Sequence, residues 1–255
     1  MSKLENKYKK ILKATLKNGT YRNDRTGIGS YSLFNQLLSW KVTKNFPMIT
    51  GRKMYQNVFN TEFDWFINGE TNIKRFKENN VKIWNEWADE NGDLGPVYGH
   101  QLRNFNSIGI DQLINVIQSI KNNPDSRRHI ISLWNPQQLK DMALPPCYLY
   151  FQFFVDNNKL NMFVVQRSGD LFLGIPYDIA LFSKLLLYIA SETNKLANKI
   201  DLQIVDAHVY NNQIESVKEY LNTKCYDMPK FTYINKKLNI IDYKFDKKIT
   251  CKVAV

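Results

Sequence analysis

Residues 148–155 form a run of apolar and aromatic side chains that only Gln152 interrupts. A strand with one wet face alternates apolar and polar residues, so such a run is typical of a strand that is covered on both faces. A sheet built around this strand therefore needs a layer on each side. We expect the long apolar helix over residues 179–190 to provide one layer and the sheet of a second subunit to provide the other.

Apolar spacing elsewhere predicts helices that flank a mixed sheet. Residues 4–16, 54–66 and 114–120 have helical spacing, and these runs end at Asn18-Gly19, at Asn68-Gly69 and before Pro124, whereas residues 29–42 have a strand-like pattern. A chain of 255 residues with 44% hydrophobic content can bury a full core, and no stretch has the composition of a linker or repeat. We predict one α/β (α+β) domain over residues 1–255.

The cysteines and apolar runs exclude several classes of protein. Cys147, Cys225 and Cys251 form neither an even disulfide framework nor a CxxC pair, which indicates a reducing compartment and no metal site. The apolar stretches are too short to span a bilayer, and the N-terminus lacks the apolar stretch of a signal peptide. We predict a protein of the cytoplasm, or of the host cytoplasm if a bacteriophage encodes it, without a membrane partner.

The formal charge of +11 allows two interpretations. Lys and Arg neutralise phosphates, so a basic chain can bind nucleic acid. The basic residues here are mostly scattered lysines, whereas the arginines lie inside motifs. We interpret the charge as a solvated surface that steers small anionic ligands, with nucleic-acid binding the less favoured alternative.

One cysteine is placed for chemistry. Cys147 follows two prolines, which fix the backbone before it, and the stretch from Gln166 to Asp178 adds an arginine, a hydroxyl and two carboxylates. A thiolate is a strong nucleophile near neutral pH, and a guanidinium both favours the thiolate and binds anions. The alternative is a small buried hydrophobe, the usual fate of a free cysteine.

These segments resemble the thymidylate synthase family. That family has Leu-Pro-Pro-Cys-His followed by Gln-Arg-Ser-x-Asp-x-x-Leu-Gly-x-Pro-Phe-Asn, and further motifs match in order at residues 23–27, 84–99, 124–128 and 206–210. The chain departs from the pattern at Tyr148, Val165 and Asp178. The resemblance implies a large mixed β-sheet covered by helices, an obligate homodimer joined sheet to sheet, and 5,10-methylenetetrahydrofolate as co-substrate without a metal.

The resemblance also implies catalytic roles. Cys147 would add to C6 of a deoxypyrimidine monophosphate, after which C5 attacks the methylene group of the folate. Glu62 would relay protons to the ring, with Tyr98 near the C5 proton, although the helical spacing also allows Glu62 on a solvent-facing side. Arg167 and Asp178 complete the catalytic set.

Binding roles follow for the remaining motif residues. The phosphate would be held by Arg25, Arg167 and Ser168, together with Arg127 and Arg128 from the other subunit, for which the alternative is surface ion pairing. His208 and Tyr210 lie on one face of a strand and would bind the 3′ hydroxyl, and Gln166 and Asp170 also face the nucleotide. The implied folate cleft consists of Arg52, Lys53, Ile83, Trp84, Asp170, Leu173, Gly174, Tyr177 and Val253, with the first two at the glutamate tail and the last in a C-terminal lid. Trp84 could instead be a core residue.

Asp178 bears on the identity of the base. The family asparagine donates to O4 and accepts from N3–H of uracil, whereas cytosine reverses both requirements, and an aspartate can meet them in either protonation state. Tyr148 replaces a histidine near the same edge of the base. We therefore predict that dCMP is favoured over dUMP, which resembles the dCMP hydroxymethylase and methylase branch known chiefly from bacteriophages.

Three functions remain open from the sequence. The known dCMP enzymes of the family mostly hydroxylate, which favours 5-hydroxymethyl-dCMP, although retention of Trp84, Tyr177 and the lid suits hydride transfer and 5-methyl-dCMP. The alternative is a thymidylate synthase that tolerates Asp178. A regulatory nucleic-acid binder on an inactive scaffold is disfavoured because the catalytic set is intact.

Overall fold

The computed structural model describes residues 2–24 and 26–254. Within them a six-stranded sheet has the order β1-β2-β6-β5-β4-β3, in which only β5 and β6 pair in parallel. The strands are β1 (Thr20–Arg22), β2 (Ser30–Lys41), β3 (Ile130–Ser132), β4 (Tyr148–Asp156), β5 (Lys159–Asp170) and β6 (Leu196–Tyr210), and a separate hairpin pairs β7 (Lys230–Ile234) with β8 (Lys237–Ile241). The large mixed sheet is confirmed.

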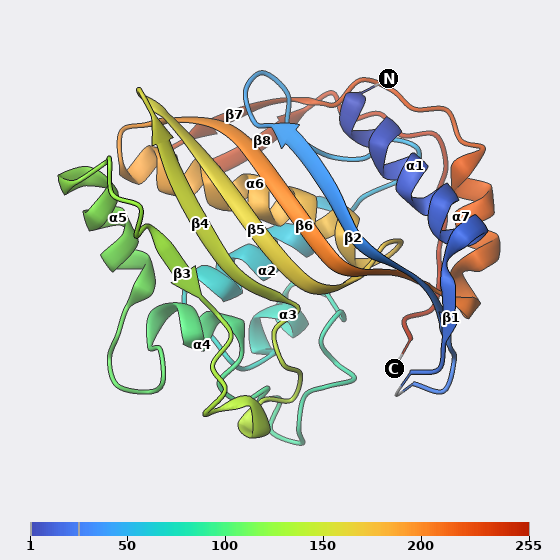
Figure 1. Ribbon diagram of the computed structural model, residues 1–255, viewed down its shortest axis with the longest axis horizontal. Coiled ribbons are helices and arrows are strands. Elements are labelled where there is room, and N and C mark those ends of the chain that lie inside the picture. Colours follow the sequence, from blue (N-terminus) through green and yellow to red (C-terminus); the bar gives the residue numbers. More distant parts are fainter. Residues whose placement is uncertain (1, 25, 255) are drawn as a thin grey trace.

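Helices cover one side of this sheet. In Figure 1, α2 and α6 lie behind the strands, and no helix lies in front of β4 and β5. The helices are α1 (Lys3–Asn18), α2 (Gln56–Ile67), α3 (Lys74–Glu78), α4 (Tyr98–Arg103), α5 (Gln112–Asn122), α6 (Gly174–Glu192) and α7 (Ile214–Leu221), with short 3₁₀ turns η1 (Leu139–Asp141) and η2 (Asn211–Gln213). The apolar run over residues 179–190 is buried almost throughout, as its composition predicts.

The ends of α1 follow from local chemistry. The Ser2 hydroxyl accepts a hydrogen bond from the Glu5 backbone N–H, which caps the first turn. At the other end a side chain on Gly19 would place its Cβ 2.4 Å from the Thr15 carbonyl oxygen. The helix therefore ends at the expected Asn18-Gly19. Glycine is needed at position 19 because of this close approach, since its φ of −65° is not left-handed.

A β-bulge at the start of β4 sets which side chains face the helices. Tyr148 pairs with Gln166 and Tyr150 with Val165, so Leu149 is an extra residue in β4. Tyr148 consequently shares the buried, helix-covered side with Phe151 rather than pointing to the opposite one. Because of the bulge, the side chains of Cys147 and Tyr148 both line one cavity.

The other side of the sheet remains open within the single chain. Phe154 on β4 and Ile130 on β3 are 64% and 46% exposed, whereas their neighbours Phe153 and Ile131 are buried. Large apolar side chains on a helix-free sheet face are typical of an interaction surface. The second covering layer expected from the sequence therefore stays a prediction that concerns a partner.

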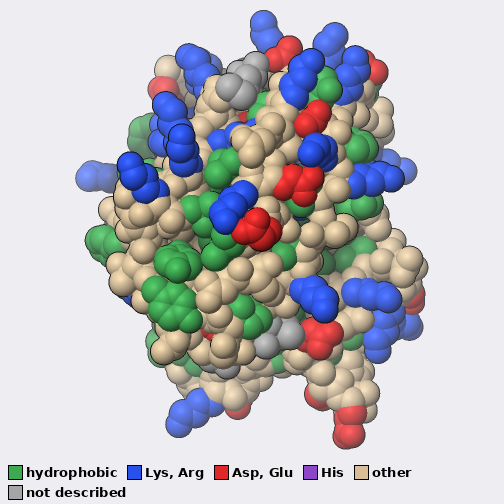
Figure 2. Space-filling model, turned by 90° about the vertical axis from the view of Figure 1, so that its right-hand side faces the viewer, with side chains coloured by type: hydrophobic (Ala, Val, Ile, Leu, Met, Phe, Trp, Pro, Cys, Tyr) green, Lys and Arg blue, Asp and Glu red, His purple; other side chains and the backbone are tan. Residues whose placement is uncertain are grey.

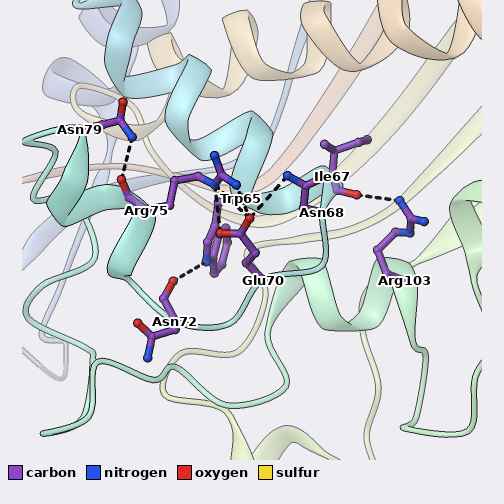
Figure 3. A network of polar contacts seen from close by, with 8 residues as sticks. All are labelled: Trp65, Ile67, Asn68, Glu70, Asn72, Arg75, Asn79 and Arg103. Carbon is purple, nitrogen blue, oxygen red and sulfur yellow. Dashed lines mark hydrogen bonds and ion pairs between the residues drawn. The ribbon is translucent and has the colours of Figure 1, made fainter.

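Polar contacts at the end of α2 tie it to α3 and α4, as Figure 3 shows. The Arg75 guanidinium pairs with the Glu70 carboxylate, and the Arg103 Nη1 donates to the Ile67 carbonyl oxygen over 2.9 Å. The Trp65 indole N–H donates to the Asn72 carbonyl oxygen over 3.2 Å. Because α2 carries Glu62 and α4 begins at Tyr98, this network fixes the two helices that supply two site residues.

Charge is mixed on the face that carries α1 and α7. Figure 2 shows Lys and Arg side chains spread over it, with Asp and Glu side chains among them. This pattern is typical of a solvated surface. None of the helices in the described part of the chain combines the length and the apolar character needed to cross a bilayer.

Candidate active site

A cavity of about 240 Å³ lies where α2, α4, α6 and the strands β4 and β5 meet. Its walls come from segments that are far apart in the chain, including the C-terminal segment through Val253. The cavity brings together thirteen residues expected from the sequence, which are Glu62, Ile83, Trp84, Tyr98, Cys147, Gln166, Ser168, Asp170, Leu173, Gly174, Tyr177, Asp178 and Val253. These positions are therefore one site in space.

Cys147 is held by its neighbours on two sides. Its backbone N–H donates to the Tyr98 hydroxyl oxygen over 2.8 Å, and its carbonyl oxygen accepts from the Arg167 backbone N–H over 2.8 Å. The Arg167 guanidinium donates to the carbonyl oxygens of Pro145 and Pro146, each over 2.9 Å. The two prolines thus precede the thiol and also hold the Arg167 guanidinium through their carbonyl oxygens.

Of the three acidic residues that line the cavity, Glu62 and Asp178 have raised pKa values. Burial raises the pKa of Glu62 to about 8, with a further rise from Asp178, against a hydrogen bond over 3.3 Å from the Trp84 indole N–H. Burial also raises the pKa of Asp178 to about 7, against the hydrogen bond that Gln166 donates to it over 2.9 Å. Both groups can therefore hold or release a proton near neutral pH, which suits proton transfer. The solvent-facing alternative for Glu62 is wrong, because its carboxyl lines the cavity.

Asp170 has a structural task in the cavity wall. One oxygen accepts from the backbone N–H groups of Phe172 and Leu173, over 2.8 and 2.9 Å, and the other accepts from the Gln213 side chain over 2.7 Å. These bonds fix the turn that leads into α6. The predicted contact between Asp170 and the pterin would have to share these oxygens, and it stays a prediction.

His208 and Tyr210 lie side by side at the end of β6. Their ring centroids are 4.9 Å apart, and His208 pairs in register with Asp170. Burial lowers the pKa of His208, but hydrogen bonds to Asp206 and the negative charges of Asp170 and Asp206 together raise it by more, so the net pKa lies above the ordinary value. The shared face expected for the two residues is present, although neither lines the cavity.

Several predicted site residues lie apart from the cavity. Arg127 and Arg128 are exposed on the loop before β3. Arg52 is buried, and its guanidinium donates a hydrogen bond to the Phe172 carbonyl oxygen over 2.6 Å. The Lys53 ammonium lies over the Tyr55 ring. One chain therefore does not bring these four basic residues to Cys147. Arg25 lies outside the described residues.

Three lining residues escaped the sequence analysis, namely Val58, Trp87 and Leu144. They are apolar and carry no chemical signal of their own. Val58 precedes Glu62 by one helical turn, so helix periodicity could have placed it on the same side. Tyr148, noted in the sequence only as a departure from a family pattern, also lines the cavity.

A thiol and carboxyls with raised pKa values in one largely apolar cavity are typical of an enzyme site for nucleophilic catalysis. The thymidylate synthase family model matches residues 6–255, so the chain belongs to the thymidylate synthase family. It is 41% identical over 252 residues to proteins named thymidylate synthase from Francisella tularensis subsp. holarctica strains FTNF002-00 / FTA, OSU18 and LVS, with 94% of this chain and 92% of each relative covered.

Family membership gives the coarse activity. The protein is a folate-dependent enzyme that transfers a one-carbon unit from methylenetetrahydrofolate to a pyrimidine nucleotide. The aromatic walls of Trp84, Trp87 and Tyr177 beside the polar end that contains Cys147 suit the stacking of a flat ring. Within residues 2–24 and 26–254, no three His, Cys, Asp or Glu side chains are grouped so that they could hold a metal ion.

Proposed function

We propose that this enzyme transfers its one-carbon unit to C5 of dCMP in preference to dUMP. The observation that carries the proposal is Asp178, which lines the cavity and accepts, among the described residues, a hydrogen bond from Gln166 on Oδ2 and none on Oδ1. The remaining oxygen, Oδ1, can face the base. With a pKa of about 7, the carboxyl can donate to N3 of cytosine when protonated and accept from the C4 amine, a pattern that uracil reverses.

The discrimination follows from buried hydrogen bonding. A site built for one donor and acceptor pattern leaves groups unpaired when the other base binds, and each unpaired buried group costs about 1–3 kcal/mol. Ionised Asp178 would face O4 of uracil with a second acceptor. The preference for dCMP is therefore expected in kcat/KM rather than in maximal rate alone.

Each catalytic residue has one task in the proposed reaction. The Cys147 thiolate adds to C6, and the electron pair that appears at C5 attacks the methylene carbon of the folate. Loss of the C5 proton, with Tyr98 beside it and Glu62 as relay, expels tetrahydrofolate and leaves a methylene group on C5. Arg167 and Ser168, with Arg25, Gln166, His208 and Tyr210, hold the phosphate, base and sugar.

The product depends on what reaches that methylene group as the bond from Cys147 to C6 breaks. Water gives 5-hydroxymethyl-dCMP and tetrahydrofolate, whereas hydride from tetrahydrofolate gives 5-methyl-dCMP and dihydrofolate. The resemblance to dCMP hydroxymethylases supports the hydroxymethyl product as our proposal. The enclosing walls of Trp84, Tyr177 and Val253 support the methyl product as the alternative.

A second candidate is thymidylate synthesis from dUMP, which the 41% identity to relatives of that name favours. A regulatory nucleic-acid binder is the weaker alternative, because it has no need of a cavity with Cys147, Glu62 and Asp178. The test is turnover of each nucleotide with methylenetetrahydrofolate, followed by mass spectrometry of the nucleotide and detection of dihydrofolate. Preference for dUMP with release of dihydrofolate would falsify the proposal.

We also propose a homodimer with shared sites. The helix-free face of the sheet, with Ile130 and Phe154 exposed, supports a partner there. Arg127 and Phe154 both line a depression on this face of the sheet. Arg127 and Arg128 could therefore contact a second subunit that packs there. Such a partner would supply the second covering layer of β4 and complete the phosphate site.

A further inference from the structure

Tyr148 is fixed in the cavity wall by aromatic packing. Its ring is 4.6 Å from the Tyr98 ring and 5.2 Å from the Phe182 ring, measured between centroids, and the residue is only 5% exposed. The bulge at Leu149 aims it toward the cavity, which it lines. The phenol therefore has a defined place rather than a choice of rotamers.

The hydroxyl of Tyr148 stays protonated in this environment. Burial raises its pKa well above the ordinary value, and Tyr98, Glu62, Asp178 and Cys147 raise it further because each carries negative charge when it ionises. A neutral phenol has one hydrogen to donate and lone pairs with which to accept. The same four groups mark its position at the reacting end of the cavity.

Several side-chain oxygens at this end of the cavity receive no hydrogen bond among the described residues. Hydrogen bonds among the described residues reach one oxygen of each carboxyl, Oε1 of Glu62 from Trp84 and Oδ2 of Asp178 from Gln166. The Gln166 Oε1 is buried and has no hydrogen-bond partner in the described part of the chain, although Gln166 lines the cavity and is only 3% exposed. An unpaired acceptor in such a place requires a donor from a ligand or water.

These oxygens decide how the Tyr148 hydroxyl is used. The Tyr148 hydroxyl has no hydrogen bond among the described residues, and its hydrogen can turn to Glu62 or Asp178 when that group is ionised, since hydrogen bonds to charged acceptors are the stronger ones. Its lone pairs are then left for the ligand. An amino group on the base can donate to these lone pairs. An oxo group would either face the lone pairs of the Tyr148 oxygen or compete with the carboxylate for the hydroxyl hydrogen.

We propose that Tyr148 is a specificity-determining residue, which acts with Asp178 to select an amino group over an oxo group at C4 of the bound pyrimidine. The inference rests on the proposed function and deepens it. Asp178 reads N3 and one hydrogen of the amine, and Tyr148 accepts the other hydrogen. The two residues reach this point from different elements, β4 and α6.

The test replaces Tyr148 by Phe, which keeps the ring packing and removes the hydroxyl. The ratio of kcat/KM for dCMP to that for dUMP is expected to fall about tenfold, the effect of one hydrogen bond. Tyr150→Phe is the matched control, because Tyr150 lies on the same strand beyond the bulge and does not line the cavity. It should leave the ratio unchanged.

The background of Asp178→Asn makes the interpretation specific. In this background the enzyme already presents the opposite hydrogen-bond pattern to the base. Adding Tyr148→Phe should therefore change the dCMP to dUMP ratio of kcat/KM less than it does in the parent, as expected for two groups that bind the same amino nitrogen. Tyr148→His, which keeps a ring with a polar atom that can donate, should also lower the ratio and provides a second variant if Tyr148→Phe is unstable.

The failure of the inference and that of the proposed function are distinguishable. A parent enzyme that prefers dUMP overturns the proposed function before any variant is made. Equal loss of kcat/KM for both nucleotides in Tyr148→Phe, with a ratio within about twofold of the parent, would mean a structural role and overturn the inference alone.

Discussion

The Tyr98 hydroxyl oxygen accepts the backbone N–H of Cys147 over 2.8 Å. The phenol is therefore hydrogen-bonded to the main chain of Cys147, the proposed nucleophile, rather than only adjacent to it. Burial raises the pKa of Tyr98 well above its ordinary value, and Cys147 is the next largest cause, so the phenol stays neutral. One side chain thus holds the backbone of Cys147 and keeps a hydroxyl in the cavity wall.

Replacing Tyr98 by Phe should lower kcat far more than it changes KM. The variant leaves a buried N–H without its acceptor, which costs about 1–3 kcal/mol, and this corresponds to a loss of roughly ten- to a hundredfold if the cost falls on the transition state. Steady-state kinetics with both nucleotides measures the split. Unchanged kcat with a raised KM would contradict the positioning role.

Replacing Cys147 by Ala should abolish turnover and leave nucleotide binding within a few-fold of the parent. The covalent step disappears, whereas Arg167 keeps its contacts with Pro145 and Pro146 through its own side chain. Tritium release from C5 of labelled nucleotide reports the chemistry, and calorimetry reports the binding. Cys225→Ala is the control, since Cys225 does not line the cavity; release by the Cys147 variant near the parent rate would exclude it as the nucleophile.

Replacing Asp178 by Asn should invert the choice of base. If the Gln166 side chain keeps donating to the amide oxygen, the amide nitrogen takes the place of Oδ1 and presents a donor to the base, which matches O4 of uracil and not the C4 amine of cytosine. We expect the ratio of kcat/KM values to shift toward dUMP by about 10²-fold or more. Asp156→Asn, at the exposed end of β4, should leave the ratio where it is in the parent. A ratio that stays constant in Asp178→Asn would show that the base is read elsewhere.

The two cavity carboxyls also predict a pH dependence of stability. Because the pKa of Glu62 is raised from 4.5 to about 8, the native protein holds a proton that the unfolded chain releases over this range. The unfolded state binds fewer protons there, so the free energy of unfolding falls as pH rises from about 5 to 8. Glu62→Gln removes this proton and should flatten the dependence by on the order of 1–3 kcal/mol.

Chemical denaturation at pH 5, 6.5 and 8, at one fixed protein concentration, measures this difference between Glu62→Gln and the parent. Glu215→Gln is a suitable control because Glu215 is exposed and pairs only with Lys218 in the part of the chain that the structure describes. Parallel pH profiles for the parent and Glu62→Gln would contradict a raised pKa at this site.

The sequence predicted the elements whose signal is local. The helix over residues 179–190 and the stop at Asn18-Gly19 follow from apolar spacing and from glycine. The bulge at Leu149 has no such signal, since it depends on the register between β4 and β5, and without it the place of Tyr148 could not be foreseen. Likewise the charge state of Asp178 depends on burial and on Gln166, which only the folded chain brings together.

The positions of the basic residues could be predicted from the sequence only in part. Arg167 is placed by contacts within its own chain, and the structure gives its partners directly. Arg127 and Arg128 come from a motif that matches equally well, but they lie on an exposed loop away from the cavity. A motif gives the type of residue and not the subunit to which its site belongs, so these two roles require an assembly.

Subunit mixing tests that assembly. An Arg128→Ala variant and a Cys147→Ala variant, each inactive alone, should regain activity when mixed under conditions of subunit exchange, because the heterodimer contains one site with both residues intact. Random exchange gives up to about a quarter of the parent activity, since about half of the dimers are mixed and each has one working site. Mixing Cys147→Ala with Arg167→Ala is the matched control and should stay inactive, because the Arg167 backbone is bonded to Cys147 of its own chain and both lesions fall within the same half-site. If exchange is demonstrated by mass spectrometry and the first mixture also stays inactive, Arg128 does not serve the partner's site.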